Sequence, residues 1–300
     1  MKQSNICRAK GLAVMLMDER ETPTVFKNGD WVVTKLASIT KRAQENPKEQ
    51  FTSLAHLLNE DFLKSCFWEL KRDKASGIDG IRFEDYEVNL EANLKDLVVR
   101  LKSKSYRPKA VRRVYIPKPN GATRPLGIPS VEDKIVQMGV KKILEAIFEV
   151  DFIDVSYGFR PNRNCHQALN IVDKAIMTKP VNLVVDMDIE KFFDTIDHPK
   201  LIECLRQRVK DTSLLRLIVR FLKAGIMEEG KFIQTDKGTP QGGNLSPLLA
   251  NIYLHYILDL WFENRVKSQL KGFAQIIRYA DEFVVCFKSK TEERVYSEAL

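Results

Sequence analysis

The feature that most constrains the fold is the segment 275–287, in which two apolar runs flank an acidic tip. The runs are rich in β-branched and aromatic residues, and this pattern predicts a β-hairpin. The tip, Ala280-Asp281-Glu282, differs from the Asn-Gly and Asp-Gly pairs that accept positive φ in hairpin turns. Two adjacent carboxylates repel each other unless a cation lies among them. A solvated acidic turn is the commoner arrangement, so a cation site here requires a third carboxylate and phosphate-binding groups elsewhere.

A third carboxylate follows the apolar run Leu183–Val185, which predicts a buried strand. Asp186 and Asp188 lie two positions apart, so both side chains point to the same face of that strand. The end of a central strand is a common place for ligands, and the residue pattern leaves both aspartates as candidates. Asp197 precedes His198-Pro199, which predicts an N-cap and a helix, and therefore a structural role for Asp197.

Basic residues concentrate between Arg100 and Arg124, with no acidic residue among them. Blocks of like charge are commonly solvated faces or disordered tails. The second half of this block is different, because Arg113–Pro117 and Arg124–Ile128 predict two strands joined by a Pro-Asn-Gly turn. A hairpin with Lys118 and Arg124 near its tip suits the phosphates of a triphosphate or of a nucleic-acid backbone, and the charge pattern does not choose between them.

Two further loops have residues that suit ligands. Ser156–Arg163 combines aromatic and guanidinium groups, which fit single-stranded nucleic acid, although Tyr157 and Phe159 fit a role as core anchors equally well. Gly238–Tyr253 contains glycines that let backbone amides approach a ligand, followed by a helix from Ser246 with a positive N-terminal end.

Composition and net charge indicate the kind of partner and the cellular compartment. The 300 residues have a net charge of +8, which favours a polyanionic partner, although lysine-rich solvated surfaces give the same total. The five cysteines are scattered and never spaced as C-x-x-C, which predicts a reducing compartment and hence a cytoplasmic location. No apolar stretch approaches the length of a membrane span, so we expect no membrane partner.

Several motifs occur in one order along about residues 51–290. They are Lys74–Gly80, Tyr115–Gly121, Arg124–Pro129, Tyr157–Pro161, Asp188–His198, Thr239–Asn251 and Arg278–Asp281. In content and order this set resembles the reverse transcriptases encoded by group II introns, the maturase type.

The resemblance implies an α+β fold, that of a right-hand polymerase with fingers and palm, in which helices pack on a ferredoxin-like antiparallel palm sheet. We expect an N-terminal extension at residues 1–50, in which Trp31–Val33 form a short strand or a docking arm. We expect basic fingers that bind RNA and nucleotide at 51–170. The palm is expected at 171–300, with a helical fingers insertion near 198–225.

The resemblance also implies RNA-directed DNA polymerisation with two Mg²⁺ ions, for which Mn²⁺ can substitute. Two such ions about 4 Å apart lower the pKa of a primer 3′-hydroxyl and stabilise the leaving pyrophosphate. Asp188 and Asp281 are expected as the main metal ligands, with the Ile189 carbonyl and Glu282 as further ones. The spacing to the following Phe-Phe pair favours Asp188 over Asp186.

Substrate contacts follow from the same resemblance. Lys118 and Arg124 would hold the triphosphate, Gln241 and Gly242 would shape the nucleotide pocket, and Phe193 would lie under the sugar and exclude a 2′-hydroxyl. Phe192 fits a core role better. The partners implied are intron or template RNA, a DNA primer and deoxynucleotides. The residues expected to bind RNA are Arg112, Arg113, Arg160 and Arg163.

Two departures from the family pattern matter. The family has two aspartates at the hairpin tip, and here the second is Glu282, whose extra methylene shifts its oxygens. The sequence stops at Leu300 within a predicted helix, so we expect a fragment truncated before the thumb, with open surfaces through which the fragment could self-associate. Two functions are therefore weighed: a working polymerase, and an RNA-binding splicing cofactor with a weakened or vestigial polymerase site.

Overall fold

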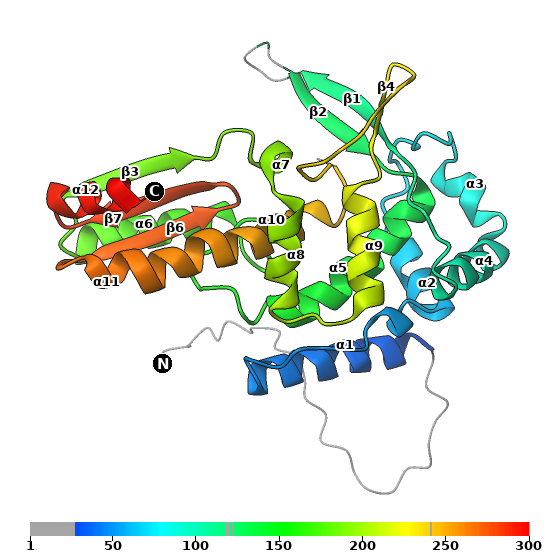
Figure 1. Cartoon of the computed structure of the whole chain (residues 1–300), viewed down its shortest axis with the longest axis horizontal. Coiled ribbons are helices and arrows are strands. Elements are labelled where there is room, and N and C mark those ends of the chain that lie inside the picture. Colours follow the sequence, from blue (N-terminus) through cyan, green and yellow to red (C-terminus); the bar gives the residue numbers. More distant parts are fainter. Residues whose placement is uncertain (1–27, 118–120, 122, 241, 300) are drawn as a thin grey trace, which may run out of the picture.

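A three-stranded and a four-stranded sheet lie apart in the molecule, with most helices between and below them (Figure 1). The structure is a computed structural model and describes residues 28–299, apart from 118–120, 122 and 241. Buried side chains of the three-stranded sheet and of the helices belong to one large hydrophobic cluster. This sheet and the helical part thus share a core.

The three-stranded sheet is antiparallel, with the order β3-β7-β6. Its strands are β3 (Leu183–Asp188), β6 (Ala274–Tyr279) and β7 (Glu282–Phe287). Several helical segments and the two short strands at 226–228 and 231–233 separate β3 from β6, and a further helix follows β7. The order within this sheet is therefore β-α-β-β-α, which agrees with the expected ferredoxin-like arrangement. Strand β3 lies at the edge of this sheet, and Val184 is 43% exposed. The expectation of a buried strand is therefore wrong for the outer face, because only the face with Leu183, Val185 and Met187 packs on the core.

Helices cover the two faces of this sheet unequally. Ile276 and Val285 pack into the main core on one face, while Ile277 and Cys286 pack against α6 (Cys165–Thr178) on the other. The part of the second face nearest the β6–β7 turn stays open. The other helical elements here are α7 (Phe192–Thr195), α10 (Ser246–Leu254), the π-helical segments η2 (His255–Asp259) and η3 (Phe262–Val266), α11 (Lys267–Gln269) and α12 (Lys290–Ala299).

The four-stranded sheet has the order β2-β1-β4-β5. The predicted basic hairpin is confirmed as β1 (Val111–Pro117) and β2 (Thr123–Ile128), which pair antiparallel. Strands β4 (Ile226–Glu228) and β5 (Lys231–Ile233) extend this sheet, because β4 pairs parallel with β1. The segment 226–233 therefore belongs to the same sheet as the basic hairpin, and the expected fingers insertion near 198–225 stays a prediction.

Helix α5 (Val131–Phe148) runs through the centre of the helical part and contacts α1, α2 and α10. As predicted, Ser130 caps it: the hydroxyl accepts a hydrogen bond from the Asp133 amide at 3.1 Å. The predicted apolar stripe is also confirmed, and each such side chain stabilises the fold by about 1.5–3 kcal/mol through burial. The fully buried residues of the stripe are Val136, Val140, Ile143, Leu144 and Ile147.

The N-terminal part of the described chain differs from expectation. Residues 31–33 belong to α1 (Asn28–Glu45), so the expectation of a short strand is wrong, whereas the alternative of an arm that docks elsewhere agrees with the packing of this helix. Val32, Ile39 and Ala43 are buried in the main core, since one face of α1 packs on α2 and α5. The rest of the helical part comprises η1 (Ala55–Leu57), α2 (Glu60–Trp68), α3 (Phe83–Glu87), α4 (Leu90–Lys102), α8 (His198–Arg206) and α9 (Thr212–Leu222).

Asp197 has the structural role predicted for it, because its carboxylate accepts a hydrogen bond from the Lys200 amide and caps α8. The neighbouring His198 is buried, with Nε2 at 2.7 Å from the Gly238 carbonyl oxygen. Within the described residues, no helix is both long enough and apolar enough to cross a membrane.

Candidate active site

The β6–β7 hairpin forms as predicted, and its turn is tight. Tyr279 and Glu282 are the last paired residues, which leaves Ala280 and Asp281 as a two-residue turn. Ala280 has φ of +61°. This left-handed conformation costs roughly 1–2 kcal/mol for a residue with a Cβ, so neighbouring contacts must hold it in place. The tip is thus a constrained turn that presents Asp281 at the end of the sheet.

Strand register brings a second and a third carboxylate to this turn. Asp188 is the cross-strand partner of Glu282, and partners in adjacent strands share a face of the sheet. Asp186 lies on the same face but opposite Val284, two pairs farther from the turn. The register therefore favours Asp188 over Asp186 as the carboxylate that acts with Asp281, while metal binding itself stays a prediction.

The electrostatics of Asp281 connect three of the predicted site residues. Burial raises the pKa of this carboxyl, and the negative charge of Asp188 raises it further. A hydrogen bond from its own backbone amide, and the positive charges of Arg124 and Arg278, act in the opposite direction. Asp281 therefore lies within electrostatic reach of both the second carboxylate and the basic hairpin.

The carboxylates at the turn fit an Mg²⁺ ion that substrate phosphates also coordinate better than they fit an ion held by protein ligands alone. Among the residues that the structure describes, no three acidic, histidine or cysteine side chains are close enough together to hold a metal alone. Mg²⁺ is commonly bound by one or two carboxylates together with substrate phosphates. The raised pKa of Asp281 beside Asp188 indicates that nearby positive charge would stabilise the ionised pair.

The structure describes only some of the residues predicted to contact the nucleotide. Lys118 and Gln241 lie outside the described residues. Arg124 is an exposed residue of β2, paired with Ile116 of β1. Gly242 lies against β2: a Cβ there would be 2.7 Å from the Gly127 carbonyl oxygen. The loop that follows Gly238 is therefore packed on the strand that carries Arg124.

Phe193 is 8% exposed and makes edge contacts with two other rings, Phe192 and Phe159. Phe192 is buried and also packs near Tyr253, which agrees with its expected core role. Phe159 is 49% exposed, at 6.3 Å between ring centroids from Phe193. Of the two alternatives left open for this loop, the role of core anchor is therefore wrong for Phe159 but agrees with Tyr157, which is buried. That Phe193 lies under the sugar stays a prediction.

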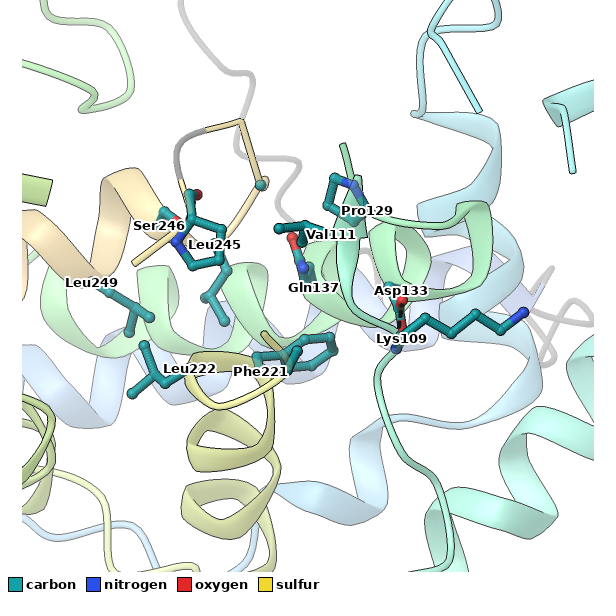
Figure 2. A pocket seen from close by; sticks show the side chains of 13 residues that line it. Lys109, Val111, Pro129, Asp133, Gln137, Phe221, Leu222, Leu245, Ser246 and Leu249 are labelled. Atoms are coloured by element: carbon teal, nitrogen blue, oxygen red, sulfur yellow. Dashed lines mark hydrogen bonds between the residues drawn. The ribbon is translucent and has the colours of Figure 1, made fainter. Parts of the chain in front are cut away.

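The loop that begins at Gly238 packs against α5 and α9. The side-chain oxygen of Gln137 accepts a hydrogen bond from the Asn244 amide at 3.0 Å. Figure 2 shows Gln137, Leu245 and Phe221 around a cavity of about 20 Å³, which is far too small for a nucleotide. This space is a packing gap beneath the loop.

The four arginines expected to bind RNA have different surroundings. The expectation that Arg160 binds RNA is corrected by its surroundings. The side chain is 7% exposed, and its guanidinium donates hydrogen bonds to Glu149 and to the carbonyl oxygens of Ile153 and Ser156. Its charge is used to fix the loop and does not face solvent.

The other three arginines remain predicted RNA contacts. Arg112 donates twice to the Ser76 carbonyl oxygen. Arg163 pairs with Asp154 and lies over the Tyr157 ring. Arg113 has a buried Nε with no hydrogen-bond partner among the described residues.

The sequence patterns did not predict the buried ion pair formed by Arg278. Arg278 is fully buried and forms an ion pair with Asp259, which is also fully buried. Period-two alternation with Ala274 and Ile276 places Arg278 on the core face of β6, and that was the available signal. A buried charge in an apolar strand requires a partner, but the strand does not reveal where the partner lies.

Comparisons with known proteins agree with this arrangement. The family described as "Reverse transcriptase (RNA-dependent DNA polymerase)" matches residues 116–300. The "Group II intron-encoded protein LtrA" of Lactococcus lactis subsp. cremoris is 43% identical over 222 residues, which are 73% of this chain and 37% of that protein. "Protein YkfC" of Escherichia coli (strain K12) is 37% identical over 240 residues, 71% of this chain and 63% of that protein.

A fungal protein gives a similar result. The "Uncharacterized 91 kDa protein in cob intron" of Schizosaccharomyces pombe is 36% identical over 253 residues, 82% of this chain and 30% of that protein. The chain thus spans from about a third to less than two thirds of the length of these relatives.

Proposed function

The chain belongs to the reverse transcriptase family, and on this premise we propose that it is the fingers and palm of a group II intron-encoded RNA-directed DNA polymerase. The substrates proposed are an RNA template, a DNA primer and deoxynucleotides. One observation carries the proposal. Strand register places Asp188 and Glu282 on one face beside the turn that holds Asp281, within electrostatic reach of Arg124.

In this proposal Asp188 and Asp281 hold two Mg²⁺ ions, together with the Ile189 carbonyl and Glu282. When bound, these ions lower the pKa of the primer 3′-hydroxyl and stabilise the leaving pyrophosphate. Arg124 binds the anionic oxygens of the triphosphate by charge-assisted hydrogen bonds. Phe193 supports the sugar from below, and Lys118 and Gln241 complete the nucleotide pocket.

Residue Glu282 favours a second candidate function. Its longer side chain shifts the carboxylate, and a displacement of about 1 Å at a reacting centre can reduce the rate roughly 10²-fold. An RNA-binding splicing cofactor with a weakened polymerase site is therefore the alternative. In this alternative the basic fingers, with Arg112, Arg113 and Arg163, bind intron RNA. For either function we propose a cytoplasmic location, which the free state of all four described cysteines supports.

Primer extension separates the two functions. The protein is incubated with an RNA template, an annealed DNA primer, deoxynucleotides and Mg²⁺, and RNA affinity is measured in parallel. Extension that requires Mg²⁺ and stops on removal of the metal by a chelator supports the polymerase. Tight binding of intron RNA without any extension would favour the splicing cofactor.

A further inference from the structure

We propose that the buried ion pair of Arg278 and Asp259 is a positioning device, which holds the Ala280-Asp281 turn in place and couples it to the loop 155–160. This inference rests on the proposed function, because it assigns to Asp281 a geometry that polymerisation requires.

The ion pair is bidentate and fully enclosed. Nε of Arg278 lies 2.8 Å from Oδ1 of Asp259, and Nη2 lies 2.6 Å from Oδ2. Both side chains have 0% exposure. Removal of two charges from water costs several kcal/mol per ion, so such a pair contributes little net stability compared with apolar packing. The two parallel hydrogen bonds of the planar guanidinium instead fix the position of Arg278 relative to Asp259.

The remaining nitrogen of Arg278 reaches the catalytic turn. Nη1 donates to the Ala280 carbonyl oxygen at 2.9 Å and to Oδ1 of Asn251 at 3.0 Å. Ala280 is the residue with left-handed φ, and its carbonyl directly precedes Asp281 in the chain. The guanidinium therefore fixes the peptide group that carries the catalytic aspartate, and this contact offsets the backbone cost of the turn.

Asp259 reaches this position from a distorted helix. It is the last residue of the π-helical segment His255–Asp259, which continues α10. A π-helical turn contains an extra residue and so re-aims the side chains relative to an α-helix, and such turns are frequent at functional sites. Asn251, about two turns earlier in α10, supplies the second anchor.

The same group of residues fixes the loop 155–160. The Arg278 amide donates to the Val155 carbonyl oxygen, the Tyr157 amide donates to the Arg278 carbonyl oxygen, and both distances are 2.9 Å. Nδ2 of Asn251 donates to the Gly158 carbonyl oxygen at 2.7 Å. Gly158 also touches the turn, because a Cβ there would lie 2.2 Å from the Ala280 amide nitrogen.

The next residue in this loop is Phe159, the half-exposed ring beside Phe193. One buried network therefore sets both the carboxylate of Asp281 and the aromatic edge of the predicted sugar site. A displacement of either segment is transmitted to the other through backbone contacts.

A matched pair of substitutions tests the device. Arg278→Lys keeps the charge but removes the fork, so it cannot bind Asp259 and the turn together. The control is Arg208→Lys, because Arg208 forms a comparable buried pair with Asp151 at 2.6 Å and also bonds to backbone carbonyl oxygens. We expect a similar loss of thermal stability in both variants. Only Arg278→Lys should lower kcat for primer extension, by about 10²-fold, and speed hydrogen exchange at the Asp281 and Glu282 amides.

A second substitution displaces the turn through its contact with the loop 155–160. Gly158→Ala leaves the ion pair intact but pushes on the Ala280 amide, and it should produce the same faster exchange and lower kcat. If Arg278→Lys does not fold, Asn251→Ala takes its place, since it removes only the bonds to Nη1 and to the Gly158 carbonyl. Equal kcat and equal exchange in the Arg278 and Arg208 variants would overturn the inference.

Failure of the proposed function is distinguishable from failure of the device. A wild-type protein that extends no primer contradicts the polymerase, whereas hydrogen exchange at the turn still reports on positioning. Faster exchange in both the Arg278→Lys and Gly158→Ala variants supports the device, and unchanged exchange overturns it.

Discussion

Substitution of Gly238 by alanine tests whether the loop behind α7 sets the nucleotide site. Gly238 has φ of +80°, and a Cβ there would lie 2.7 Å from the Phe193 carbonyl oxygen and 2.8 Å from that of Asp194. Neither atom is a flexible side-chain end, so backbone must move. The Thr239 amide also donates to the Phe193 carbonyl oxygen at 2.7 Å, so any movement reaches the predicted sugar site directly.

Gly230, at the tip of the β4–β5 hairpin, provides the matched control. Its φ is +78°, and an added Cβ would meet no atom within 4 Å. Both alanine variants incur the left-handed backbone cost of roughly 1–2 kcal/mol. Only Gly238→Ala adds the overpacking cost, typically about 1–3 kcal/mol. The difference between the variants therefore isolates the contact with α7.

Urea unfolding and steady-state kinetics measure the two consequences. We expect Gly238→Ala to lose about 1–3 kcal/mol more unfolding free energy than Gly230→Ala. It should also raise KM for deoxynucleotide and accept ribonucleotide more readily, because Phe193 is displaced. Equal stabilities, together with unchanged KM and sugar selectivity, would refute the reasoning.

Three further predictions concern charged groups of the site. Asp188→Ala should abolish primer extension and leave RNA affinity within error. Asp186→Ala should retain extension because Asp186 lies two pairs farther from the turn, and the reverse outcome would exchange the two assignments. Arg124→Ala should raise KM for nucleotide several-fold at low ionic strength with a smaller effect on kcat, and an unchanged KM would remove it from the pocket. Burial and Asp188 raise the pKa of Asp281, so this carboxyl stabilises the fold below its unfolded pKa, and that contribution is lost as pH rises through the folded pKa. Asp281→Asn should therefore raise the melting temperature at pH 7 while extension disappears, and a lower melting temperature would contradict the sign.

Local patterns predicted much of the fold because their causes are local. Alternation of apolar residues gave both hairpins, and the side-chain chemistry of Ser130 and Asp197 gave two helix starts. The period of two also placed Asp186 and Asp188 on one face. Which of them faces the turn depends on pairing with β7, and strand register across such a distance is set by tertiary packing.

Long-range contacts explain what the pattern could not provide. Arg160 was interpreted as an RNA contact because its loop combines aromatic and guanidinium groups, yet carbonyl oxygens and Glu149 enclose it. Arg278 could be placed on the core face, but its partner Asp259 lies 19 residues earlier, in a π-helical segment. No periodicity of the sequence marks that segment.

The pairing of β3 with β7 also determines when the molecule becomes complete during synthesis. Strand β3 leaves the ribosome early, but Asp188 has no cross-strand partner until residues 189–281 and then β7 have followed. The packing of α2 and α3 on α4 and the pairing of β1 with β2 depend on contacts closer in sequence, and such contacts form faster than distant strand pairs. The basic hairpin can therefore form early on the nascent chain, whereas the acidic centre forms late. During that interval β3 lacks its hydrogen-bonding partner, and an unpaired strand is a site for aggregation.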